Sequence, residues 1–154
     1  MPIHLQIDDL QSAAVQSLLT EHLAGMRGNS PPGHVNALAL ESLQDPAITV
    51  WSAWIDDDLC GCGALKQLDE ASGEIKSMRT REKYLGQGVG QAVLNEIVRA
   101  AEERCYRNLY LETGTGKAFE AAHGLYLKNG FKWCGAFGGY CATAFNVFMV
   151  REVA

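Results

Sequence analysis

Residues 85–90 read Leu-Gly-Gln-Gly-Val-Gly (LGQGVG), in which three glycines lead directly into a stretch with helical periodicity. Each glycine loses more backbone freedom on folding than any other residue, so a glycine cluster at a helix start indicates that the backbone itself is needed there. At a strand-to-helix turn, bare N–H groups point outward and the positive end of the helix dipole favours an anion. The stretch therefore predicts a site for a phosphate-bearing ligand.

Two well-known nucleotide motifs do not fit these residues. A dinucleotide-binding fingerprint requires G-x-G-x-x-G, but Gly90 is followed by Gln91 and the stretch lies late in the chain. A P-loop requires G-x-x-x-x-G-K-[ST], and neither the lysine nor the hydroxyl is present. Taken alone, the glycines also fit a tight connection that binds nothing.

Hydrophobic periodicity outward from this turn predicts alternating strands and helices. Residues 47–55, 59–68 and 73–80 should form successive antiparallel strands, and residues 108–113 should run parallel to the third of them through a right-handed crossover. Asp8 or Asp9 should cap the first helix. Further strands are expected at 3–7, 131–137 and 144–153, and helices at 15–26, 35–43, 89–105 and 117–130, the last ending at Gly130.

Composition limits the classes of protein to consider. The chain has 154 residues, 47% of them apolar and 20% charged, which fits one domain over residues 1–154. The net charge is −5 and no run of basic residues occurs, so a nucleic-acid partner is not expected. No signal-like start or membrane-length apolar stretch is present, which predicts a cytoplasmic protein without a membrane partner.

Cysteine and histidine patterns give no metal motif. The five cysteines form an odd set without a C-x-x-C pair, which indicates reduced thiols. Cys60 and Cys62 could hold a metal, but the simpler interpretation puts both on one face of a strand. The histidines are scattered and form no H-E-x-x-H, so we expect no metal cofactor.

The order of elements, with MRTREKYLGQGVG at 78–90 and GLYLKNGF at 124–131, resembles the GNAT superfamily of acyl-CoA-dependent N-acyltransferases. The resemblance covers nearly the whole chain, and its specific parts lie within residues 74–133. It implies an α+β fold with a mixed, mostly antiparallel sheet of about seven strands and about four flanking helices. A splayed pair of parallel strands in that fold binds the cofactor.

The resemblance also implies acetyl-CoA as co-substrate. Its pyrophosphate rests on a turn of the form [R/Q]-x-x-G-x-[G/A], which residues 87–92 fit; a frame that starts at Leu85 fits less well. The residues implied in cofactor binding are Met78, Arg79, Thr80, Gln87, Gly88, Val89, Gly90 and Gln91. The backbone of Met78 and Thr80 would hold the pantetheine arm, with the Met78 N–H near the thioester carbonyl. Arg79, Arg81 and Lys83 either meet phosphates or are solvated surface charges.

Three side chains are candidates for the chemistry. Tyr126 matches the tyrosine of the family's LY-x-x-x-GF signature, whose hydroxyl can protonate the leaving thiolate; the alternative is a packing role. Glu74 and Glu112 are candidate bases for the acceptor amine, directly or through water, although Glu74 could be an exposed turn residue and Glu112 could orient a neighbour. Bound waters and backbone carbonyls are the remaining candidates.

The acceptor pocket of this fold comes from the first helical region and late loops, which makes His34, Asn36 and Tyr140 candidate substrate contacts. His34 is also an alternative base or an ordinary loop residue. The leading hypothesis is direct acetyl transfer to a primary amine of a small molecule, amino acid or peptide. The rival hypotheses are an inactive acyl-CoA-binding sensor or interaction module and an enzyme with Cys134 or Cys141 as nucleophile. A homodimer is common in the resembled family.

Overall fold

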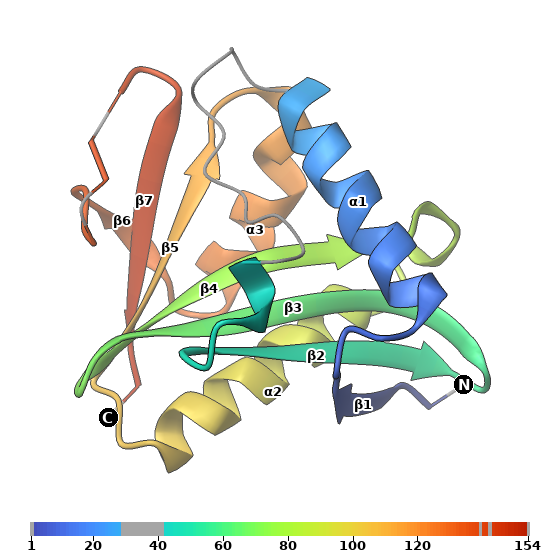
Figure 1. Cartoon of the computed structure of the whole chain (residues 1–154). Coiled ribbons are helices and arrows are strands. Elements are labelled where there is room, and N and C mark those ends of the chain that lie inside the picture. Colours follow the sequence, from blue (N-terminus) through green and yellow to red (C-terminus); the bar gives the residue numbers. More distant parts are fainter. Residues whose placement is uncertain (1, 29–41, 139, 142, 154) are drawn as a thin grey trace.

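The computed structural model describes residues 2–28, 42–138, 140–141 and 143–153 (Figure 1). These residues form strands and α-helices in nearly the predicted order. In chain order the elements are β1 (His4–Ile7), α1 (Ala13–Gly28), β2 (Ile48–Ile55), β3 (Asp58–Asp69), β4 (Ser72–Thr80), α2 (Val89–Glu103), β5 (Asn108–Gly114), α3 (Glu120–Lys128), β6 (Lys132–Cys134) and β7 (Asn146–Glu152). Short 3₁₀ turns occupy Ser42–Gln44, Glu82–Tyr84 and Lys117–Phe119.

The strands form a seven-stranded sheet in the order β1-β2-β3-β4-β5-β7-β6. Strands β4 and β5 are parallel, and the other neighbouring strands are antiparallel. The predicted mixed α+β fold is therefore confirmed, including the antiparallel run β2-β3-β4 and the parallel crossover through α2. The helix expected at 35–43 lies outside the described residues except at its end.

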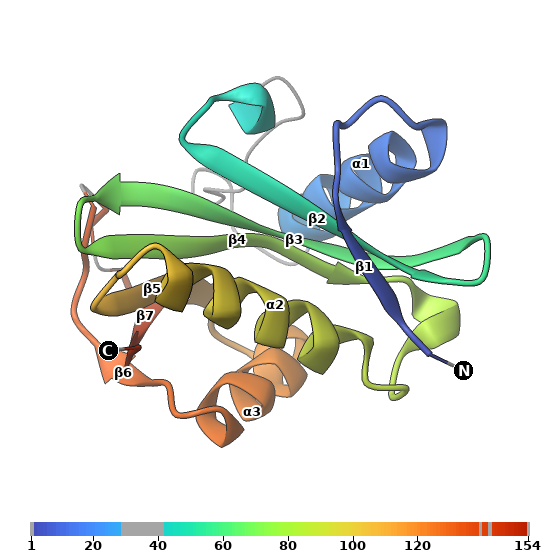
Figure 2. The same cartoon turned by 90° about the horizontal axis from the view of Figure 1, so that it is seen from below.

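Helices cover both faces of the sheet. Figure 2 shows α1 on one face and α2 with α3 on the other. A large apolar cluster joins α2 to the sheet, with Val93, Leu94 and Ile97 at most 1% exposed, and a smaller cluster packs α1 through Val15 and Leu18. Within the described residues, none of the helices is long and apolar enough to cross a bilayer.

Two local predictions are corrected by the structure. Helix α1 is capped by Ser12, whose Oγ accepts a hydrogen bond from Val15 N at 3.1 Å. The carboxylates of Asp8 and Asp9 instead accept bonds from Leu10 N and Gln11 N in the turn before the helix. Asp8, Asp9 and Ser12 are all of residue types that commonly cap helices, so the sequence alone does not indicate which of them is the cap.

Cys60 and Cys62 lie on opposite faces of the sheet, contrary to the prediction. Cys60 belongs to the cluster beneath α2 and Cys62 to the cluster beneath α1. The cause is a β-bulge, since Ala53 pairs with Gly61 while Trp54 pairs with Leu59, which leaves Cys60 as the extra residue. Burial raises the pKa of the Cys62 thiol to about 12, so this thiol stays protonated at neutral pH.

Candidate active site

Strands β4 and β5 begin side by side and then separate. Their pairing runs from Ser72 opposite Asn108 to Ile75 opposite Leu111, although the strands continue to Thr80 and Gly114. Figure 1 shows the two strands diverging toward their carboxyl ends, with α3 beside the opening. This divergence opens the sheet between its two halves.

A β-bulge in β4 accompanies the separation. Lys76 pairs with Ala64 and Arg79 with Cys62, so Ser77 and Met78 together face Gly63. Ser77 has a φ of 54°, a left-handed backbone that is uncommon for a residue other than glycine. A Cβ on Gly63 would lie 2.6 Å from Met78 Sδ, so only glycine fits opposite the bulge. The bulge bends β4 away from β5.

Two cavities meet at this opening. The first, which we call the turn cleft, has a volume of about 580 Å³ and extends along residues 78–80, the glycine turn and α3. The second, the strand pocket, has a volume of about 120 Å³ and lies between β4 and β5. Met78 and Tyr126 are among the residues that line both cavities, so the two cavities adjoin at these side chains.

The glycine turn has the geometry of an anion site. Gly86 and Gly88 have φ values of 76° and 86°, and a Cβ on either would meet nothing within 4 Å. The first backbone bond of α2 runs from Ala92 N to Gly88 O at 3.0 Å, so the preceding amide groups of the helix start have no helical partner. These glycines supply a left-handed backbone beside open space, which suits a phosphate group.

Gly90 has a different structural role from Gly86 and Gly88. A Cβ at this position would lie 3.3 Å from Leu125 Cδ2, so the residue allows α2 and α3 to pack closely. The side chain of Gln91 also joins these helices, because its amide exchanges hydrogen bonds of 2.8 and 2.9 Å with that of Asn129. Gln87 Nε2 donates to Lys83 O at 3.3 Å.

The basic residues before the turn have different surroundings. Arg79 lines the turn cleft, and its Nε is buried without a hydrogen-bond partner among the described residues. Arg81 and Lys83 form ion pairs with Asp58 at 3.2 and 3.4 Å. Tyr84 donates a short hydrogen bond to the same carboxylate, and this bond is the largest cause of the lowered pKa of Asp58. Of these cations, only Arg79 lines the cleft with an unpaired donor.

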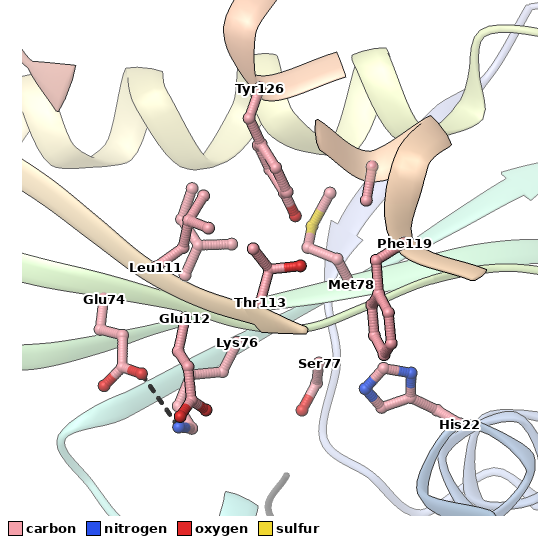
Figure 3. Close-up of a pocket in the computed structure, with 12 residues that line it drawn as sticks. His22, Glu74, Lys76, Ser77, Met78, Leu111, Glu112, Thr113, Phe119 and Tyr126 are labelled. Carbon is pink, nitrogen blue, oxygen red and sulfur yellow. Dashed lines mark hydrogen bonds and ion pairs between the residues drawn. The ribbon is translucent and has the colours of Figure 1, made fainter. Parts of the chain in front are cut away.

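Tyr126 lies where the two cavities join. The side chain is 6% exposed and packs edge-on against Phe131, with ring centroids 5.5 Å apart. Its hydroxyl points into the strand pocket toward Thr113 and Met78 (Figure 3) and has no hydrogen-bond partner among the described residues. Burial raises its pKa well above the ordinary value, so the hydroxyl keeps its proton at neutral pH.

A buried polar cluster forms one wall of the strand pocket. Glu74, only 2% exposed, accepts hydrogen bonds at its Oε2 from Lys76 Nζ at 3.1 Å and from Tyr140 OH at 2.9 Å. Lys76 Nζ also donates to the Tyr140 oxygen at 2.7 Å. Glu74 is therefore not an exposed turn residue, and Tyr140 reaches the pocket wall through these two side chains. Burial and the negative charge of Glu74 raise the pKa of Tyr140.

Glu112 and His22 contribute further polar groups to the strand pocket. Glu112, on β5, lines the pocket, and its Oε2 accepts a bond from Asn146 Nδ2 at 2.7 Å. His22, on α1, lines both cavities beside Phe119. Its pKa is lowered to about 4, mainly by burial and secondarily by the positive charge of Arg79, so the ring is neutral at pH 7.

The sequence prediction missed four polar residues that line the strand pocket: His22, Lys76, Ser77 and Thr113. No motif marks any of them, although the position of Ser77 beside the predicted Met78 is a weak signal. His34 and Asn36 lie outside the described residues. Cys134 and Cys141 are free thiols, and neither lines either cavity in the part of the chain that the structure describes. The site therefore offers no support for a cysteine nucleophile.

A cleft above a glycine turn, joined between splayed parallel strands to a polar pocket, defines an acyl-CoA-dependent acyltransferase. Residues 15–131 match the acetyltransferase (GNAT) family. The chain belongs to this family and is an acyltransferase. The uncharacterized N-acetyltransferase YsnE of Bacillus subtilis is 48% identical over 98% of this chain and 100% of its own length. The uncharacterized N-acetyltransferase YedL of Escherichia coli is 46% identical over 88% of this chain and 86% of its own.

Solved structures show the same fold. A crystal structure from Klebsiella pneumoniae, assigned to the acyl-CoA N-acyltransferases, has a TM-score of 0.80 and 22% identity over 99% of this chain and 98% of its own. A GNAT family acetyltransferase from Elizabethkingia anophelis with acetyl-CoA bound has a TM-score of 0.73 and 18% identity, over 97% of each chain. At these identities the likeness concerns the fold.

Proposed function

We propose that this chain transfers an acetyl group from acetyl-CoA directly to a primary amine of a small molecule, amino acid or peptide. The observation that carries the proposal is that the turn cleft and the strand pocket adjoin at Met78 and Tyr126, which line both. A thioester that reaches this point from the cleft would meet an amine that enters from the pocket. The acetyl-CoA bound to the related fold from Elizabethkingia anophelis supports the choice of donor.

The turn cleft fits the phosphates of this co-substrate. The glycine turn and the first amides of α2 would hold the pyrophosphate, because their N–H groups border open space. Arg79 would supply a positive charge along the cleft, since its buried Nε lacks a partner among the described residues. A thioester held in the cleft presents a carbon atom that an amine can attack.

Two side chains are assigned to proton transfers. Tyr126 would donate its proton to the departing thiolate, since its hydroxyl is protonated at neutral pH and points into the junction. Glu112 would accept the proton of the acceptor's ammonium group, directly or through a water molecule. Glu74 is the second candidate for this step; its Oε2 accepts bonds from Lys76 and Tyr140, and Glu112 Oε2 accepts one from Asn146.

Two measurements on the purified chain test the proposal. Isothermal titration with acetyl-CoA should give saturable binding, and a thiol assay over an amine library should detect CoA release above the hydrolysis background. Absence of binding at millimolar acetyl-CoA would reject the proposal. Binding without release for any amine would instead support an inactive acyl-CoA-binding module.

A further inference from the structure

Ser77 presents an unused hydroxyl at the wall of the strand pocket. The residue is 8% exposed, and its Oγ is buried without a hydrogen-bond partner among the described residues. Buried hydroxyl groups in proteins nearly always have a partner. The left-handed φ of 54° at the bulge directs this side chain to the pocket, which it lines. The unpaired Oγ therefore indicates a polar group on whatever occupies the pocket.

Lys76 offers a second donor beside it. The side chain is 6% exposed, and Nζ contacts Glu74 Oε2 at 3.1 Å and Tyr140 OH at 2.7 Å. An ammonium group has three N–H donors, and the described residues supply partners for two of them. Lys76 and Ser77 are consecutive in the bulged stretch of β4, and both line the strand pocket. A hydroxyl group and an ammonium group that line one pocket suit a carboxylate.

The remaining charges of the strand pocket exclude a simple anion. Among the described residues that line the pocket, Glu74 and Glu112 supply two carboxyl groups and Lys76 supplies one amino group. An anion without an ammonium group would face these two carboxylates. An amine without an acceptor group would leave Ser77 Oγ and one Lys76 N–H unpaired. The wall therefore matches a ligand that has both groups.

We infer that the acceptor is an amino carboxylate, an amino acid or a close analogue, whose carboxylate binds Ser77 Oγ and Lys76 Nζ while its amine faces Glu112. This inference rests on the proposed acetyl transfer and names its substrate class. The ammonium loses one proton to Glu112, its nitrogen then forms a C–N bond to the thioester carbon, and the second proton that this nitrogen loses on becoming an amide passes, directly or through water, to the Tyr126 oxygen and restores its hydroxyl. The C–S bond breaks with its electron pair on sulfur, which takes the proton of Tyr126. The products are the N-acetylamino acid and free CoA.

Matched acceptor pairs provide the first part of the test. Each amino acid is compared with the amine that lacks its carboxylate, with acetyl-CoA as donor and CoA release as readout. We expect kcat/KM to be at least about tenfold higher for the amino acid of a productive pair, because its carboxylate forms charged hydrogen bonds. Equal or higher values for the decarboxylated amines would overturn the inference and leave acetyl transfer standing.

Variants at position 77 provide the second part. Ser77→Ala and Ser77→Gly both remove the hydroxyl, and glycine also tolerates the left-handed backbone. Each should lower kcat/KM for amino acids about tenfold and leave the decarboxylated amines and the acetyl-CoA Kd unchanged. Ser72→Ala, at the other end of β4, is the matched control. An equal loss with both acceptor types would indicate a structural role of Ser77 and contradict the inference.

An acyl donor with a terminal carboxylate is an alternative occupant of the same site. Malonyl-CoA and succinyl-CoA are therefore tested as donors in the same assay. The inference is wrong if the Ser77 variants lower kcat/KM for the reaction of these donors with simple amines but leave acetyl transfer to amino acids unchanged. In that case the carboxylate that Ser77 binds belongs to the acyl donor. If acetyl-CoA binds but no acceptor of either type releases CoA, the proposed function fails and the inference fails with it.

Discussion

The two cavities that meet at Tyr126 are built in different ways. The turn cleft is formed mainly by one contiguous stretch, residues 78–91, and offers backbone amides and glycines. The strand pocket is lined by side chains that come from α1, β4, β5 and α3. A backbone site binds a ligand shared by a whole family, whereas a pocket made of scattered side chains can differ in each member. The turn cleft therefore indicates the class of reaction, and the strand pocket indicates the class of acceptor.

The largest expected effect comes from Tyr126, which lines both cavities. Tyr126→Phe should lower kcat at least about a hundredfold, because the departing thiolate loses its proton donor. The acetyl-CoA Kd should stay within about threefold of the parent value, since the ring is retained. Titration and single-turnover rates measure both quantities. Tyr106→Phe, which alters a buried core tyrosine, is the control; an unchanged rate in Tyr126→Phe would remove the proposed acid.

His22 should make stability depend on pH. Its folded pKa of about 4 lies below the ordinary histidine value of 6.5, so the unfolded chain binds more protons between these values. This contribution to stability is full above pH 6.5 and is lost as the pH falls toward 4. The loss amounts to about 2 kcal/mol for a half-buried ring.

Urea unfolding at pH 7 and pH 4.5 measures this effect. His22→Gln should show a smaller decrease in unfolding free energy than the parent, whereas His4→Gln, on the exposed strand β1, should behave like the parent. If His22→Gln retained the full pH dependence, other groups would have to be responsible.

Gly88→Val tests the backbone nature of the turn cleft. A β-branched residue at a φ of 86° is strained, and its side chain would enter the open space beside the helix start. The acetyl-CoA Kd should rise about tenfold, with a smaller change in kcat at saturation. Gly124→Ala, at an open position on α3, should leave the Kd unchanged. A parent-like Kd for Gly88→Val would exclude the turn as the anion site.

The smallest effect is expected for Gln91→Ala. The side chain bonds Asn129 across α2 and α3, and only its backbone N–H belongs to the helix start. Its loss should cost about 1 kcal/mol of unfolding free energy and change the acetyl-CoA Kd by less than about threefold. A large loss of affinity in a correctly folded variant would show that the side chain binds the co-substrate.

The difference between the cavities also explains which parts could be predicted from the sequence. The glycines at 86 and 88 indicate positive φ values, and the hydrophobic periodicity of the strands and helices predicts the order of the elements. Ser77 has a left-handed backbone without a glycine to signal it, and the extra residue at Cys60 reverses the strand alternation that the prediction assumed. The hydrogen bonds of Tyr140 with Lys76 and Glu74 join residues 64 and 66 positions apart in the chain, so no local pattern contains them.

The most direct test is a crystal structure of this chain with CoA bound. We expect the pyrophosphate to contact the backbone amides at the start of α2 beside Gly86 and Gly88. We also expect the sulfur atom to lie within hydrogen-bonding distance of the Tyr126 hydroxyl, at the mouth of the strand pocket. Phosphates bound away from the glycine turn, or a thiol remote from Tyr126, would contradict the proposed function.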